Sequence, residues 1–150
     1  MRLVIPRDYL EKIVKTAKNS AAEVCGFLFG GTDGGSLTVK EIRFVTNRLN
    51  SPTAFEMEPL EMVEAIDGAE EGGLEVIGIF HSHLNCPPRP SGKDLRGMNL
   101  WPVVWLIVTP EGEARAWVLK DEGIEEVEIV HPEVARGMFG EMEQQRNSKD

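Results

Sequence analysis

The stretch Leu74–His83, LEVIGIFHSH, decides the fold of this 150-residue chain and carries its first functional signal. It is mostly apolar and rich in β-branched residues, which predicts a buried strand that ends in a pair of histidines. Residues two apart on a strand face the same side, with Cα atoms about 7 Å apart. Both His81 and His83 can therefore converge on one ion, while Ser82 points into the opposite layer. The alternative is a pair of half-exposed histidines at a strand end.

A candidate third ligand follows eleven residues after His83. The connecting loop Leu84–Pro90 contains three prolines, which fix φ and lower the entropy lost when the loop folds back over the strand end. Asp94 could then return to the histidines. Two histidines and one carboxylate leave a fourth tetrahedral position open, as in a catalytic zinc site. Taken alone, however, Ser91 and Asp94 have the Ser-x-x-Asp spacing of a helix capping box.

A carboxylate interrupts the apolar run Ala21–Gly31, AAEVCGFLFGG, which predicts a mostly buried strand with a turn at Gly30–Gly35. Burying the Glu23 carboxylate in that strand costs several kcal/mol unless it is paired or protonated. Glu23 is either a solvated first residue of the strand or a general base beside a zinc-bound water.

The remaining pattern predicts one α/β domain, residues 1–150, with a mixed sheet flanked by helices. Apolar residues at helical spacing indicate helices over 6–20, 59–69 and about 132–145, and a helix start at Ser91–Asp94. Alternating or β-branched segments indicate further strands over 37–45, 103–109, 114–120 and 124–130, the last three as a meander.

Composition excludes several classes of protein. Apolar residues make up 41% of the chain and charged residues 27%, as in an ordinary folded domain. No segment has the length of a bilayer span, and charge comes too early for a signal peptide, so we expect a cytoplasmic protein without a membrane partner. The net charge of −9, without a segregated basic patch, argues against nucleic acid as a partner.

The two cysteines, Cys25 and Cys86, exclude a disulfide framework and a four-cysteine zinc finger. Buried free thiols are the favoured interpretation, and a disulfide between them stays open. Trp101, Trp105 and Trp117 are most simply core residues.

An acidic segment lies between Leu49 and Pro88, where eight carboxylates occur without any Lys or Arg. It is either a solvated helix face or a docking surface that steers a basic partner, with Glu61 and Glu64 as the residues to neutralise.

The combined pattern resembles the JAMM motif of the MPN-domain metallopeptidases. It consists of Glu23 within EVCGFLFG, the pair His81 and His83, seven residues, Ser91, two residues and Asp94. The segment Asn47–Pro59, with FEMEP at its end, also resembles the region before the middle helix of the family.

This resemblance implies a cytidine-deaminase-like architecture and a Zn²⁺ cofactor bound by His81, His83 and Asp94. It implies that Glu23 is the general base and that Ser91 hydrogen-bonds the oxyanion. It further implies hydrolysis of the amide bond after the C-terminal Gly-Gly of a ubiquitin-like modifier, whose conjugates would be the partners. The short chain is similar to the compact prokaryotic and archaeal members, which lack the insertions of eukaryotic deubiquitinases.

Other functions stay open at this stage. The protein could process the C-terminus of a sulfur-carrier or ubiquitin-like protein, or it could be a non-catalytic MPN scaffold. A zinc deaminase is disfavoured because its His-x-Glu and Pro-Cys-x-x-Cys motifs are absent. A monomer and a homodimer are equally compatible with the sequence.

Overall fold

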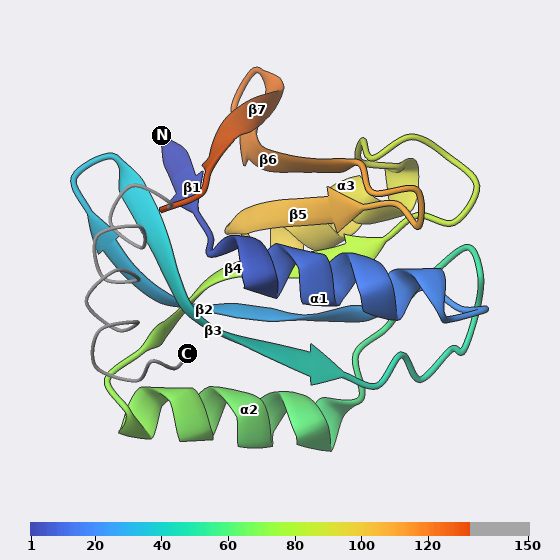
Figure 1. Cartoon of the computed structure of the whole chain (residues 1–150), viewed down its shortest axis with the longest axis horizontal. Coiled ribbons are helices and arrows are strands. Elements are labelled where there is room, and N and C mark those ends of the chain that lie inside the picture. The colour runs from blue at the N-terminus through green and yellow to red at the C-terminus, as the bar shows by residue number, and fades with distance from the viewer. Residues whose placement is uncertain (133–150) are drawn as a thin grey trace, which may run out of the picture.

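The computed structural model describes residues 1–132, so the helix predicted over 132–145 lies outside the described residues. These residues form seven strands and three helices (Figure 1). In chain order they are β1 Arg2–Val4, α1 Arg7–Lys18, β2 Cys25–Asp33, β3 Ser36–Val45, α2 Pro59–Glu71, β4 Glu75–Ser82, α3 Gly92–Leu100, β5 Val104–Val108, β6 Ala114–Lys120 and β7 Gly123–Val130.

The strands pair in the order β1-β3-β2-β4-β5-β6-β7 and close into a barrel. Closure depends on β1, which pairs in parallel with both β3 and β7. β4 and β5 are also parallel, and the other neighbours are antiparallel. The predicted mixed sheet with flanking helices is confirmed. The closure of the sheet into a barrel was not predicted, because β1 has only three residues and is too short to show periodicity.

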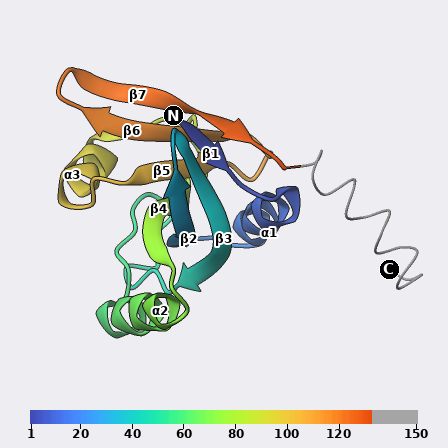
Figure 2. The ribbon, with the colours of Figure 1, turned by 90° about the vertical axis from the view of Figure 1, so that its left-hand side faces the viewer.

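Helices cover both faces of the sheet. Figure 2 shows α1 on one side and α2 and α3 on the other. The period-2 alternation of the strands supplies a core to each face. Leu28 packs in the core that includes Ile13 of α1, whereas Phe27 and Phe29 pack in the core that includes Met98 of α3. His81 and His83 follow Ile79 by two and four residues, so they point to the same face of the sheet as Ile79. This is the face covered by α2 and α3.

The predicted boundaries of β2 need correction. The strand begins at Cys25 and not at Ala21, so Glu23 lies in the connection that precedes it. It then continues to Asp33, and the hairpin turn is confined to residues 34–35, with Gly34 at φ +63°. Gly26 permits close contact with β3, since a Cβ there would lie 2.2 Å from the carbonyl oxygen of Arg43.

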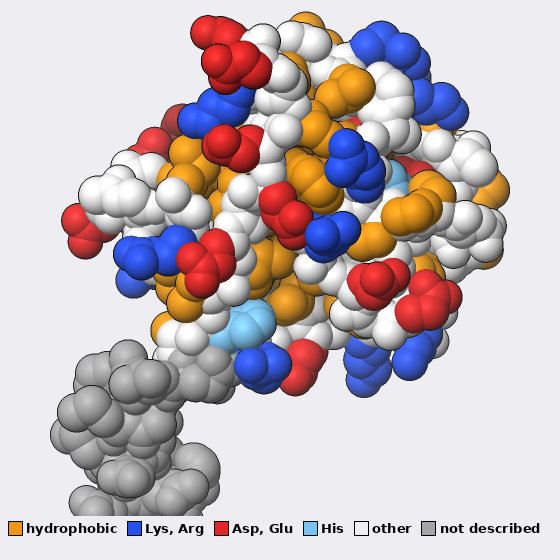
Figure 3. Space-filling model, turned by 90° about the horizontal axis from the view of Figure 1, so that it is seen from above, with side chains coloured by type: hydrophobic (Ala, Val, Ile, Leu, Met, Phe, Trp, Pro, Cys, Tyr) orange, Lys and Arg blue, Asp and Glu red, His pale blue; other side chains and the backbone are white. Residues whose placement is uncertain are grey.

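None of the three described helices has both the length and the apolar composition that a bilayer span requires. The face over β6 and β7 carries interspersed acidic and basic side chains around apolar ones (Figure 3). The negative charge of the chain is therefore not gathered on that face.

Candidate metal centre and active-site cavity

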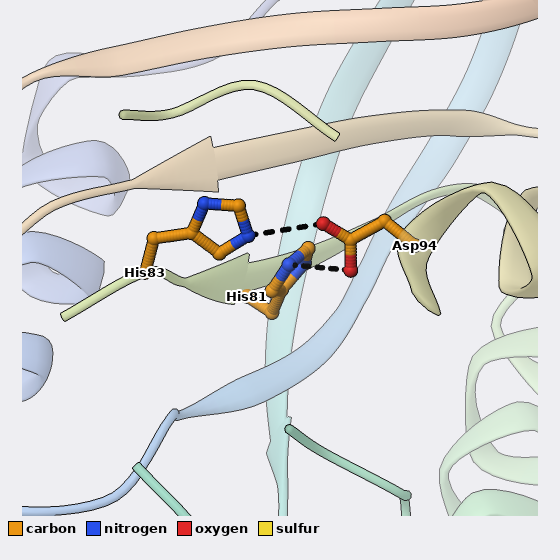
Figure 4. Close-up of side chains that lie close together, drawn as sticks. All are labelled: His81, His83 and Asp94. Carbon is orange, nitrogen blue, oxygen red and sulfur yellow. Dashed lines mark hydrogen bonds and ion pairs between the residues drawn. The ribbon is translucent and has the colours of Figure 1, made fainter. Parts of the chain in front are cut away.

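His81, His83 and Asp94 form a buried cluster at the carboxyl end of β4. The side chains of the two histidines and of Asp94, from the start of α3, point toward one another (Figure 4). His81 Nε2 lies 3.1 Å from Asp94 Oδ1, and His83 Nε2 lies 3.0 Å from Asp94 Oδ2. One donor atom of each residue lies within 4.8 Å of the others. The proline loop thus returns the carboxylate to the histidines.

The ring of His83 is fixed from its far side. Its Nδ1 lies 2.7 Å from the carbonyl oxygen of Pro87, which can only accept, so Nδ1 carries the proton. Burial by itself lowers the pKa of His83, but the contacts with Asp94 and the Pro87 carbonyl outweigh it and raise the pKa. Nε2 is left facing the carboxylate.

His81 is completely buried and stacks on Phe55, with ring centroids 4.6 Å apart. Neither of its ring nitrogens makes a hydrogen bond, because the approach of Nε2 to Asp94 lacks hydrogen-bond geometry. Burial lowers the pKa of His81, which favours the neutral ring. A buried imidazole without a hydrogen bond is uncommon, and a neutral ring of this kind is suited to bind a metal ion.

Asp94 combines both interpretations of the Ser-x-x-Asp spacing. Ser91 Oγ accepts from the Asp94 N–H at 3.1 Å, and Asp94 Oδ2 accepts from the Ser91 N–H at 2.9 Å, so a capping box begins α3. The same carboxylate faces both imidazoles. Burial alone would raise the pKa of Asp94, but its contacts with His81 and His83 hold the pKa well below the usual range.

These residues fit a divalent cation. Two imidazole nitrogens and two carboxylate oxygens direct lone pairs into one buried space, an arrangement that needs positive charge between them. Neutral imidazoles and an ionised carboxylate form the donor set that zinc binds, and the Pro87 carbonyl orients the ring of His83. The chemistry of the donors therefore supports the predicted metal site.

Glu23 lines the same cavity, of about 540 Å³, as His83, Ser91 and Asp94. It is only 6% exposed. Burial raises its pKa to about 7, and the nearby His83 partly offsets the rise. The interpretation of Glu23 as a solvated first residue of the strand is therefore wrong.

A single side chain holds the backbone of Glu23 and the cavity wall together. Asn47 Nδ2 donates to the carbonyl oxygens of Glu23 and Ala54, at 3.0 Å each. Its Oδ1 accepts from the N–H groups of Leu49 and Glu56. The Glu23 N–H also donates to the same part of the chain, residues 47–56, at the carbonyl oxygen of Ser51. Sequence reasoning missed Asn47, whose side chain satisfies four backbone groups at once.

The other cavity walls come from residues 52–59 and from α3 and the segment after it, including Lys93, Leu100 and Trp101. Trp105 and Trp117 are buried, as predicted, whereas Trp101 is half-buried and lines the cavity. Both cysteines are free thiols. Cys25 is buried, and burial raises its pKa to about 12, whereas Cys86 is exposed at the cavity rim, contrary to the expectation of a buried thiol.

The chain is similar to several known proteins over most of its length. The desampylase of Pyrococcus furiosus is 55% identical over 129 residues, which span 85% of this chain and 89% of the relative. The desampylase of Haloferax volcanii is 34% identical, over 77% of this chain and 86% of the relative. The solution structure of protein DSY2949 from Desulfitobacterium hafniense matches with a TM-score of 0.76 at 29% identity, over 86% of this chain and 92% of that chain.

The fold, with a buried His-His-Asp cluster that fits a metal ion, is that of a JAB-class domain. The family described as prokaryotic homologs of the JAB domain matches residues 6–120. The chain belongs to this family, which confirms the resemblance to the JAMM and MPN proteins.

Proposed function

We propose that this protein is a zinc-dependent isopeptidase that hydrolyses the amide bond after the C-terminal Gly-Gly of a ubiquitin-like modifier. The observation that carries the proposal is the shared cavity of Glu23, His83, Ser91 and Asp94, since Glu23 comes from a distant part of the chain. The relatives add support, because two of them are desampylases and a further one, from Thermus thermophilus, is described as a probable TtuB-protein conjugate cleaving protease.

His81, His83 and Asp94 would hold the zinc ion. When bound, zinc lowers the pKa of a coordinated water to about 7 and polarises a carbonyl oxygen. Glu23, whose buried carboxylate lines the same cavity, would take a proton from the attacking water and deliver it to the leaving amine. A carbon–oxygen bond forms, the carbon–nitrogen bond breaks, and the products are a carboxylate terminus and a free amine.

In this proposal Ser91 would stabilise the oxyanion. Its Oγ already accepts from the Asp94 N–H, which uses a lone pair and leaves the hydroxyl proton available to donate. Ser91 is exposed and lines the cavity, so substrate can reach it. Removing one such donor typically costs about 10²-fold or more in kcat.

The test is incubation of the purified protein with a Gly-Gly-terminated modifier joined to lysine by an isopeptide bond, with the products read by intact mass. A linear fusion of the same modifier tests the processing of a peptide bond. We expect cleavage that a chelator abolishes and zinc restores. Glu23→Gln should lower kcat by about 10²- to 10⁴-fold while zinc stays bound. Full metal loading without cleavage of either substrate would instead indicate a non-catalytic scaffold.

Four finer expectations accompany this proposal. They are a single catalytic domain over residues 1–150, a cytidine-deaminase-like arrangement of the sheet, a cytoplasmic location and a monomer or homodimer. A structure of the zinc-loaded protein and its mass in solution would test the architecture and the oligomeric state.

A further inference from the structure

Trp117 of β6 contacts the loop Leu84–Pro90, which connects His83 to the start of α3. Its side chain is buried, and its indole N–H donates to the carbonyl oxygen of Pro88 at 2.8 Å. The guanidinium of Arg89 lies over the same indole, 5.3 Å from the ring centroid. Two consecutive loop residues are therefore attached to one side chain on a strand 29 residues further along the chain.

These attachments reach His83 through a single peptide unit. The carbonyl of Pro88 and the N–H of Arg89 belong to the same planar peptide. The carbonyl end is held by Trp117, and the N–H end donates to the carbonyl oxygen of Pro87 at 2.8 Å. That Pro87 oxygen is also the acceptor for His83 Nδ1 at 2.7 Å. The peptide plane thus transmits the position of the indole to the acceptor that orients the imidazole.

We infer that Trp117 is a positioning residue for His83, which it orients through the peptide between Pro88 and Arg89. A hydrogen bond at Nδ1 keeps the proton there and leaves the Nε2 lone pair for the ion. The inference rests on the metal site of the proposed function but not on its substrate. Trp117 touches neither metal nor substrate in this role.

The alternative is that Trp117 only fills the core. The structure offers a matched pair of variants that separates the two roles, because two cations lie over this indole. Arg89 belongs to the loop, whereas Arg115 approaches from β6, 5.5 Å from the ring centroid, and pairs with Glu126. Arg89→Ala and Arg115→Ala remove equivalent contacts with the ring, but only Arg89→Ala weakens its attachment to the loop.

The experiment measures zinc affinity by competition with a chromophoric chelator, for wild type, Trp117→Phe, Arg89→Ala and Arg115→Ala. Trp117→Phe keeps an aromatic ring and removes the N–H donor. Changes to a residue that orients a metal ligand without touching the metal cost about 10-fold or more in metal affinity, so we expect about a 10-fold loss. Arg89→Ala should lose a few-fold, and Arg115→Ala should stay within about 2-fold of wild type.

A second readout reports on the ring itself. Long-range ¹⁵N–¹H spectra of the metal-free protein, recorded at a pH high enough to keep His83 neutral, should show its proton on Nδ1 in wild type and in Arg115→Ala. In Trp117→Phe the spectrum should show a mixture of tautomers. Wild-type zinc affinity in Trp117→Phe, or equal losses in Arg89→Ala and Arg115→Ala, would overturn the inference.

If Trp117→Phe does not fold, the arginine pair decides the question alone. Failure of the proposed function gives a different result, namely no cleavage by wild type while the ranking of zinc affinities persists.

Discussion

The hydroxyl oxygen of Ser82 accepts a hydrogen bond of 2.9 Å from the main-chain N–H of Val24. The Ser82 N–H returns a bond to the Val24 carbonyl at 3.1 Å. This double link joins the residue between the two histidines to the residue after Glu23, although 58 positions separate them in the chain. It explains how the carboxylate of Glu23, far upstream in the chain, comes to lie near His81, His83 and Asp94.

Ser82→Ala should therefore displace Glu23 without removing a metal ligand. The Val24 N–H loses its side-chain acceptor in a partly buried position, which costs about 1 kcal/mol of unfolding free energy. We expect kcat to fall about 10-fold while one zinc ion per chain is retained, measured by steady-state kinetics and metal analysis. An unchanged kcat in a folded, zinc-loaded variant would show that the link does not position Glu23.

Asn47→Ala tests a second support of Glu23, the hydrogen bond to its carbonyl oxygen. It removes the donor to the Glu23 carbonyl and three further bonds to the segment that walls the cavity. We expect a loss of about 2 kcal/mol in unfolding free energy by denaturant titration, together with a lower kcat. Amide exchange at Glu23, whose N–H bonds to Ser51, should accelerate more than exchange at Phe27 within β2.

Arg48→Ala is the matched control for Asn47. It removes an exposed ion pair with Glu56 from the same segment but leaves the Glu23 carbonyl bonded. It should keep wild-type kcat. If both variants lose the same fraction of kcat, the segment contributes through its general order and not through Asn47.

Metal removal should lower the thermal stability of the protein. An ion that binds only the folded state adds about 2.7 kcal/mol when its free concentration is 100 times Kd. The melting temperature should therefore rise with added zinc and fall with chelator in wild type. His83→Ala and Asp94→Ala should abolish this response, whereas His131→Ala should retain it, because His131 bonds to Ile5 outside the cluster. A zinc response that survives in both ligand variants would place the metal elsewhere.

Much of the sheet could be predicted from sequence because its central strands are apolar and β-branched. β4 ends at Ser82, so the histidines stand at a strand end as expected. β1 could not be predicted, since its three residues become a strand only by pairing with β3 and β7. Its identity depends on partners distant in the chain and not on a local pattern.

The three side chains that meet in the His81, His83 and Asp94 cluster could be predicted from sequence, but the residues that support them could not. The HSH triplet and Asp94 carry a spacing with a chemical meaning, whereas Trp117 and Asn47 act through bonds to backbone groups that no pattern marks. Glu61 illustrates the same limit. Within the acidic segment it has the sequence character of a surface charge, yet its carboxylate accepts the Thr46 N–H at 2.8 Å, and this bond lowers its pKa. Glu64 is thus the better residue to neutralise when the acidic segment is tested as a docking surface.

The pKa of Glu23 predicts how the stability of the metal-free protein depends on pH. Burial raises that pKa from 4.5 to about 7 on folding. Between these values the folded protein holds a proton that the unfolded chain has released, so the unfolding free energy falls as pH rises through this window and levels off above it. Glu23→Gln carries no such charge.

In chelator, the variant should therefore match wild type near pH 4 and be more stable near pH 8. The difference should be about 1 kcal/mol, reduced from the full pKa shift because the carboxylate faces a cavity with an exposed rim. Denaturant titrations at a series of pH values measure this difference directly, with Glu64→Gln, on the exposed face of α2, as the control for the loss of one negative charge. A gain in stability at pH 8 that persists unchanged at pH 4 would mean that improved packing, and not the buried charge, distinguishes the variant. The difference at pH 8 measures how much the buried Glu23 charge destabilises the fold. The protein tolerates this loss because it keeps a proton acceptor beside His83 and Asp94.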